Sequence, residues 1–117
     1  MKTYEGKRVE GKCLVTVYDG NKTTPLEPFF LGRPKPGCEF SWGWGFRCFG
    51  AIRLAEAILA DFLGCDKKAF LEDEKNIDSS YYFGMNVFKK LEKSQSWILT
   101  SEDIEKTLEA WSEQCAA

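Results

Sequence analysis

The sequence predicts an α+β domain, with three or four short antiparallel strands in a small sheet and about three helices packed on one face. Two observations lead to this prediction. Segments rich in strand-forming residues lie in the first part of the chain, and apolar residues at helical spacing lie in the second part. The length of 117 residues is that of one domain with a sizeable core, so a single domain over residues 1–117 is expected.

A short strand and a hairpin are expected at the N-terminal end. Residues 2–9 could form the first strand, and residues 10–11 a turn. Residues 13–18, CLVTVY, are rich in β-branched and aromatic types, which predicts a second strand. The run Asp-Gly-Asn at 19–21 is a strong turn signal, so the chain is expected to return as a hairpin through residues 22–26.

A proline-rich loop is expected next, because all four prolines lie between residues 25 and 36 and proline suits neither a helix interior nor a central strand. Two interpretations of its apolar centre remain open. The apolar side chains close the core beneath the loop, or they form an exposed anchor for a protein partner, flanked by positive charge. The residues concerned are Phe29, Phe30, Leu31, Arg33 and Lys35.

A strand, a glycine turn and a helix are expected across residues 40–63. Aromatic residues occupy alternate positions at first, which is the period of a strand: Phe40, Trp42, Trp44 and Phe46. From residue 51 the spacing becomes that of a helix with one apolar stripe: Ile52, Ala55, Ile58, Leu59 and Phe62. Arg53, Glu56 and Asp61 lie off this stripe, and Gly64 suits a C-terminal cap.

The glycine turn does not match a nucleotide-binding loop. Gly45 and Gly50 have the spacing of a phosphate loop, but Ala and Ile replace the Lys and Ser/Thr that hold phosphate and magnesium. Cys48 replaces the third glycine of the dinucleotide pattern. The favoured interpretation is that the glycines let the tryptophans turn into the core. Anion binding at the helix start, through Arg47 and Arg53, stays open.

Three further elements are expected in the second half. A helical turn is expected at residues 69–71, followed by an exposed acidic patch, Glu72, Asp73 and Glu74, which is a second candidate partner surface. Ser79 or Ser80 could cap a helix over residues 80–93. Its expected apolar stripe is Tyr81, Met85, Phe88 and Leu91.

The chain is expected to close with a buried strand and a helix. Residues 97–99 form the short strand, and Thr100 caps the last helix with Asp103 in the capping-box position. The apolar seam of that helix is Ile104, Leu108, Trp111 and Cys115.

Composition excludes several chemistries. The chain has no histidine, which excludes Ser-His-Asp and Cys-His catalysis and His-ligated metal sites. Its five cysteines form no CxxC pair, so free thiols in a reducing cytoplasm are expected and no metal site is predicted. No apolar run reaches the length of a membrane span. We therefore expect a cytoplasmic protein that is not an enzyme and needs no cofactor.

Three motifs give the chain a resemblance to a known family. The first comprises Phe40, Trp42, Gly43, Trp44 and Gly45; the second Leu54, Ala55, Ala57, Ile58 and Leu59; the third Trp97, Leu99, Thr100, Asp103 and Ile104. Together they resemble the signature of an uncharacterised domain family of bacteria and phages. The resemblance implies a fold outline and a setting in phages and mobile elements, hence the host cytoplasm, but no activity.

The leading functional hypothesis is a non-enzymatic protein-binding module of phage or mobile-element type. Its sharpest form is an inhibitor of a host defence complex, similar to an anti-CRISPR protein. One alternative is a small-ligand or anion-binding domain that uses the glycine-rich turn at residues 43–50. The other is single-stranded nucleic-acid binding through basic and aromatic side chains, against which the net charge of −2 argues.

Overall fold

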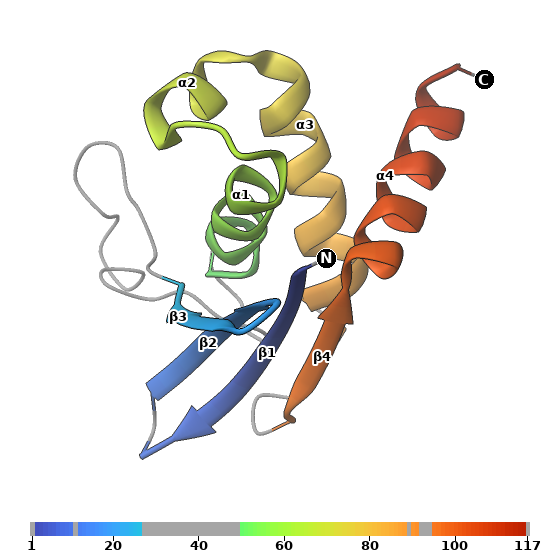
Figure 1. Ribbon diagram of the computed structural model, residues 1–117. Coiled ribbons are helices and arrows are strands. Elements are labelled where there is room, and N and C mark those ends of the chain that lie inside the picture. Colours follow the sequence, from blue (N-terminus) through green and yellow to red (C-terminus); the bar gives the residue numbers. More distant parts are fainter. Residues whose placement is uncertain (1, 11, 27–49, 89, 92–94, 117) are drawn as a thin grey trace, which may run out of the picture.

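The computed structural model describes residues 2–10, 12–26, 50–88, 90–91 and 95–116 (Figure 1). The strands are β1 (Lys2–Val9), β2 (Lys12–Asp19), β3 (Lys22–Pro25) and β4 (Trp97–Thr100). The helices are α1 (Gly50–Leu63), α2 (Lys67–Glu72), α3 (Glu74–Phe83), the π-helical segment η1 (Gly84–Phe88) and α4 (Ser101–Ala116). The strand predicted at residues 40–46 lies outside the described residues, as does most of the proline-rich loop.

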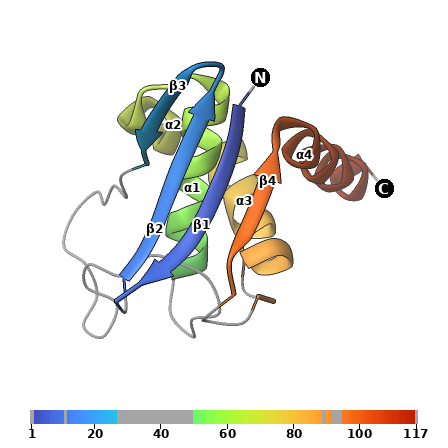
Figure 2. The ribbon, with the colours of Figure 1, turned by 60° about the horizontal axis from the view of Figure 1, so that its bottom comes forward.

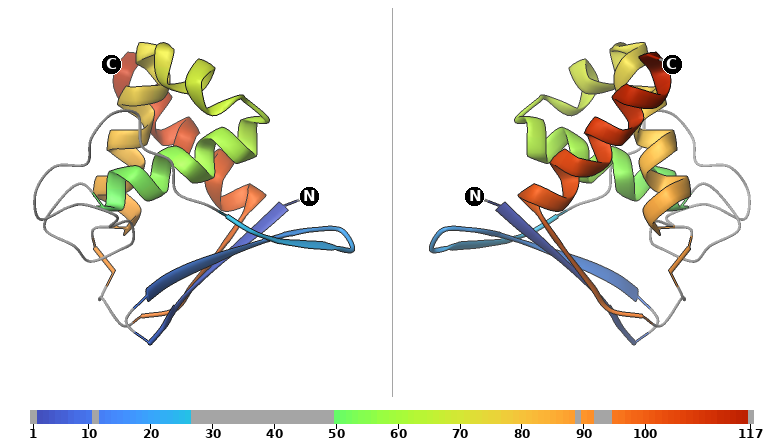
Figure 3. Two further views of the ribbon diagram at one scale, coloured as in Figure 1. Left: turned by 90° about the vertical axis from the view of Figure 1, so that its left-hand side faces the viewer. Right: turned by 90° about the vertical axis from the view of Figure 1, so that its right-hand side faces the viewer.

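The four strands form one antiparallel sheet in the order β3-β2-β1-β4. All helices lie on one face of this sheet, and its other face is uncovered by the described elements (Figure 3). The predicted α+β class, with helices on a single face, is therefore confirmed. The N-terminal hairpin predictions are confirmed as β1, β2 and β3, and β3 ends at Pro25 on the sheet edge, where proline is tolerated.

Helix α1 forms the centre of the core. It runs behind β1 and β2 (Figure 2) and packs on its other side against α3 and η1. Of the predicted stripe, Ala55, Ile58 and Leu59 are fully buried, while Ile52 and Phe62 are half-buried. Leu54, which lies outside the predicted stripe, is fully buried as well. Glu56 lies off that stripe and is nevertheless buried, with only 4% of the residue exposed. A one-stripe pattern misses it because the helix is covered on two sides, so residues outside the stripe are enclosed as well.

Asp61, also off the stripe, ties the end of α1 to the start of β1. The buried Tyr4 hydroxyl donates to Asp61 Oδ2 at 2.7 Å, and Lys2 Nζ donates to the same oxygen at 3.2 Å. Lys2 Nζ also donates to the Asp61 carbonyl at 3.0 Å, which places a cation at the helix C-terminus. Burial, with the hydrogen bond to Asp61, raises the pKa of Tyr4 well above its usual value, so the phenol stays protonated.

Gly64 ends α1 as predicted. Its φ of 68° lies in the left-handed region, where a side chain is disfavoured. The Gly64 amide donates to the Asp61 carbonyl at 3.2 Å, and the Cys65 amide donates to the Ala60 carbonyl at 3.0 Å. This pair of bonds is the Schellman motif, which satisfies two carbonyls at the helix end.

The predicted start of the next helix is wrong. The helix α3 begins at Glu74, and Asp73 is its N-cap, with Oδ1 accepting from the Lys75 amide at 2.9 Å. Ser79 and Ser80 are buried inside the helix rather than capping it. The expected helical turn at residues 69–71 is confirmed as α2, whose N-cap is Asp66. The consecutive helices α2 and α3 therefore each begin after an aspartate N-cap.

The predicted apolar stripe of this segment is confirmed in part. Phe88 is fully buried and Leu91 packs against the core, but Tyr81 is 54% exposed. Phe83, outside the predicted stripe, is fully buried, with its ring centroid 5.5 Å from that of Phe88. The physical reason is η1, where the backbone turns once in more than four residues. Residues five apart then share a face, a spacing that a search for three- and four-residue repeats does not detect.

The C-terminal strand and helix follow their predictions in part. The helices cover only one face of the sheet, so alternate side chains of β4 differ in burial: Trp97 is buried and Ile98 is 61% exposed. The capping box is confirmed, since the Thr100 amide donates to Asp103 Oδ2 at 3.0 Å and the Asp103 amide donates to Thr100 Oγ1 at 3.1 Å. None of the helices in the described ranges has both the length and the apolar character to span a bilayer.

Gly6→Ala should destabilise the protein by about 1–3 kcal/mol, because a methyl group at this position would overlap the indole ring of Trp97, its partner in register on β4. Denaturant unfolding measures the effect. In a Trp97→Leu background, which removes the obstructing ring, Gly6→Ala should cost less. An equal cost in both backgrounds would assign the effect to the β1 backbone instead of the indole.

Asp103→Asn should lower stability at neutral pH by about 0.3–1 kcal/mol, since the charged cap at the start of α4 is lost. Hydrogen bonds from Thr100 hold the pKa of the Asp103 carboxyl below its usual value. The stabilisation is thus present above the ordinary aspartate pKa and is lost as the pH falls through the folded pKa. The free energies of unfolding of the wild type and of Asp103→Asn should converge as the pH is lowered from 7. A difference that stays constant with pH would argue against a role for the charge.

Candidate functional site

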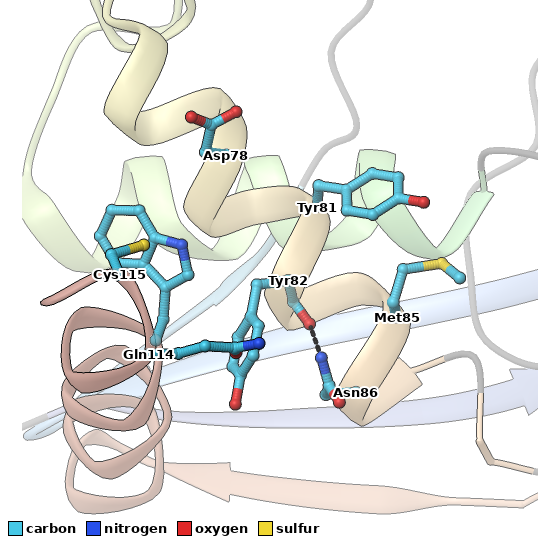
Figure 4. Close-up of a pocket in the computed structure, with 8 residues that line it drawn as sticks. Asp78, Tyr81, Tyr82, Met85, Asn86, Gln114 and Cys115 are labelled. Atoms are coloured by element: carbon cyan, nitrogen blue, oxygen red, sulfur yellow. Dashed lines mark hydrogen bonds between the residues drawn. The ribbon is translucent and has the colours of Figure 1, made fainter. Parts of the chain in front are cut away.

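An open groove lies between α3 and α4, with a volume of about 390 Å³ (Figure 4). Its position follows from the seam of α4, which is covered progressively less toward the C-terminus. Ile104 is fully buried, Leu108 and Trp111 are half-buried, and Cys115 is exposed. The lining residues are Asp78, Tyr81, Tyr82, Met85, Asn86, Trp111, Gln114 and Cys115.

The two walls are single helix faces. On the α3 side, Asp78, Tyr81, Tyr82 and Met85 follow the i, i+3, i+4, i+7 spacing that places side chains on one face. On the α4 side, Trp111, Gln114 and Cys115 follow i, i+3, i+4 in the same way. Gln114 reaches from α4 toward Tyr82 in Figure 4. Aromatic and amide side chains therefore meet across the groove.

One wall is also held by a local hydrogen bond. The Asn86 side-chain amide donates to the Tyr82 carbonyl at 2.8 Å, at the junction between α3 and η1 (Figure 4). The π-helical turn that follows brings Met85 and Asn86 to the groove while Phe83 and Phe88 enter the core. The same backbone irregularity thus separates groove residues from core residues.

The helices that form the groove are strongly acidic. Their carboxylates are Glu74, Asp78, Glu102, Asp103, Glu105, Glu109 and Glu113, and all seven are exposed. Their only cations are the exposed Lys75 and Lys106. Together α3 and α4 carry a net charge of −5, against −2 for the whole chain, so the remainder carries +3.

The predicted partner residues are divided between described and undescribed parts of the chain. Outside the described residues lie Phe29, Phe30, Leu31, Arg33, Lys35, Arg47 and the glycine turn up to residue 49, while Gly50 begins α1. Glu72, Asp73 and Glu74 are exposed where α2 meets α3, and they continue the acidic surface of α3. Of the three, Asp73 also has the structural role of capping α3.

Arg53, the other predicted anion-binding residue, has an internal partner. Its Nη1 lies 2.9 Å from Glu56 Oε1, and the Arg53 side chain is 35% exposed while that of Glu56 is 6% exposed. Burial raises the pKa of Glu56, and the Arg53 guanidinium partly opposes the increase. The guanidinium is therefore engaged by a buried carboxylate, which an external anion would have to replace.

Other candidate chemistry is sparse in the described part of the chain. No group of three or more metal-ligating side chains lies together there. Among the described cysteines, Cys65 and Cys115 are exposed free thiols. Polar and aromatic residues on a helix surface carry no distinguishing pattern, so four of the groove residues were not predicted from the sequence: Asp78, Tyr82, Asn86 and Gln114.

One comparison with known proteins gives a match. A family model described as a family of unknown function, DUF6166, matches residues 4–110. The chain belongs to this family. No curated protein and no solved structure matches the chain. The predicted membership of an uncharacterised family is confirmed, while its phage setting stays a prediction. The DUF6166 match covers the α3 wall of the groove and ends just before Trp111, the first lining residue on α4.

Glu56→Gln should change how stability depends on pH. Because the folded pKa of Glu56 is raised, its contribution to stability is greatest below the ordinary glutamate pKa and is lost as the pH rises through the folded pKa. The wild type should therefore gain stability relative to Glu56→Gln as the pH falls from 7 to about 4. Thermal unfolding across this range measures the difference.

Arg53→Met provides the matched control, since the guanidinium lowers the pKa of Glu56. Removing it should move the pH-dependent change to higher pH. A change that stays at the same pH in both backgrounds would mean that Arg53 and Glu56 are not coupled.

Proposed function

We propose that this protein is a non-enzymatic protein-binding domain whose partner engages the groove between α3 and α4. The composition of the groove is the observation that supports this most directly. Tyrosine, tryptophan and methionine are enriched at protein interfaces, and the groove is lined by Tyr81, Tyr82, Met85 and Trp111. The tyrosine and tryptophan side chains offer a large apolar area with few rotatable bonds, and the methionine side chain adapts its shape. Both properties suit contact with another protein chain.

The shape of the groove favours a macromolecular partner over a small ligand. Small-molecule sites enclose most of the ligand surface, whereas this groove is open along its length. Tyr81 is 54% exposed at the groove, so a small ligand here would remain largely in water. A protein segment can cover both walls at once and bury more of the exposed aromatic area.

The charge of the groove helices favours a protein over a nucleic acid on this face. A net charge of −5 over α3 and α4 repels phosphate, and nucleic-acid affinity depends mainly on cations that neutralise phosphates. Two alternatives stay predictions: anion binding at the glycine turn of residues 43–50, and single-stranded nucleic-acid binding through basic and aromatic side chains. Residues 43–49 of the turn lie outside the described part of the chain.

The narrower form of the proposal is an inhibitor of a host defence complex of the anti-CRISPR type. One feature supports it: protein complexes that handle nucleic acid present basic surfaces, which the acidic helices would attract. The phage origin and the cytoplasmic location belong to this narrower proposal.

Site-specific photo-crosslinking in the native host cells tests the location of the partner. A benzoyl-phenylalanine residue at position 114, in the groove, should give a covalent adduct with another protein after irradiation. The matched control carries the same residue at position 98, because Ile98 is 61% exposed on the uncovered face of the sheet. Mass spectrometry of the adducts reads out both variants.

Adducts at position 114 and none at position 98 are the expected result. Adducts only at position 98 would move the interface to the sheet, and adducts at neither position would overturn protein binding by the groove.

A further inference from the structure

We infer that the segment which occupies the α3–α4 groove is a positively charged amphipathic helix of the partner protein. This inference rests on the proposed function, and it adds the chemistry of the occupant. Three observations carry it: the charge along the α3 wall, the charge on the outer side of α4, and the length and shape of the lined surface.

Carboxylates continue the aromatic face of α3. Asp78 lines the groove itself, and Glu74 lies one helical turn earlier on the same face. Both are exposed, and the structure gives neither of them a salt bridge within the described residues. A partner that fills the aromatic part of the groove therefore meets unpaired negative charge next to it, which a lysine or arginine can neutralise.

The outer side of α4 adds a longer-range attraction. Glu102, Glu105, Glu109 and Glu113 repeat at three- and four-residue spacing, so they share the side of α4 away from Trp111. Within the described residues, only Glu102 of these four forms an ion pair, with its Oε1 3.3 Å from Lys106 Nζ. A helix is about 10 Å across, close to the Debye length at physiological salt, so this field extends to the groove and steers a cationic segment toward it.

The shape indicates a helical occupant. The lined face from Asp78 in α3 to Met85 in η1 spans about 11 Å at about 1.5 Å per residue, which is two turns of a facing helix. An amphipathic helix that lies in such a groove inserts apolar residues at i, i+3, i+4 and i+7. Its apolar side chains would contact Tyr82 and Trp111, while its lysines and arginines would face Asp78 and Glu74.

A selection from a random dodecapeptide library, with the folded full-length protein as bait, tests the inference without assuming a sequence. The expected peptides carry net positive charge and apolar residues at three- and four-residue spacing. Binding of a selected peptide should perturb the indole N–H signal of Trp111 in NMR spectra, assigned with Trp111→Phe. Its affinity should fall as salt is raised.

Two variants with the same change in net charge show whether peptide affinity depends on charge in the groove or on the net charge of the whole protein. Asp78→Lys in the groove should weaken the selected peptide at least about tenfold, which corresponds to about 1.4 kcal/mol. Glu10→Lys, at an exposed position in the β1–β2 turn, should leave the affinity within about twofold. Circular dichroism confirms that both variants are folded.

Failure of the inference and failure of the proposed function give different results. Peptides that perturb Trp111 but are neutral or acidic, or that bind Asp78→Lys and Glu10→Lys equally, would overturn the cationic occupant and leave groove binding intact. Selected peptides that leave Trp111 unperturbed, or a selection that enriches none, would overturn both.

Discussion

Leu54, Ala55, Ile58 and Leu59 on α1 have no exposed surface, because the sheet covers one side of this helix while α3 and η1 cover the other. Each buried leucine or isoleucine contributes about 1.5–3 kcal/mol relative to exposure, so this packing is a large stabilising contribution in the described core. The other tertiary contacts follow from it. Tyr4 and Lys2 join β1 to the end of α1 through Asp61, and Ser101 Oγ donates to the Lys2 carbonyl at 2.7 Å, joining α4 to the same strand.

The groove is a consequence of the same packing. Phe83, at the end of α3, and Phe88, in η1, are both buried in the core beside α1. The ring centroid of Phe88 lies 5.0 Å from that of Trp97 on β4, with the two rings tilted relative to each other. The π-helical turn that achieves this leaves Tyr81, Tyr82 and Met85 on the other side, facing α4 or solvent. α4 is joined to the core through Ile104 and the Ser101–Lys2 hydrogen bond near its start, and through the half-buried Leu108. Its later turns leave aromatic surface open. The packing that buries Phe83 and Phe88 in the core therefore also leaves aromatic side chains accessible at the groove.

Local sequence signals predicted the elements that depend on local chemistry. The hairpin strands, the Gly64 cap of α1 and the Thr100–Asp103 capping box each depend on residues within a few positions of one another, and each is confirmed. The start of α3 was misplaced because two neighbouring types of cap, aspartate at 73 and serine at 79 or 80, are equally acceptable locally. Only the packing of Ser79 and Ser80 against the core decides between them.

By itself, the sequence determined the α+β class, the central helix and the absence of histidine chemistry, since hydrophobic period, turn residues and composition are properties of the chain alone. Tertiary structure decided which polar residues are enclosed and which aromatic residues are exposed. Glu56 is buried because α1 is covered on two sides, and Tyr81 is exposed because a π-helical turn changes the spacing of the residues that reach the core. Both outcomes depend on segments far apart in sequence, which no local period encodes.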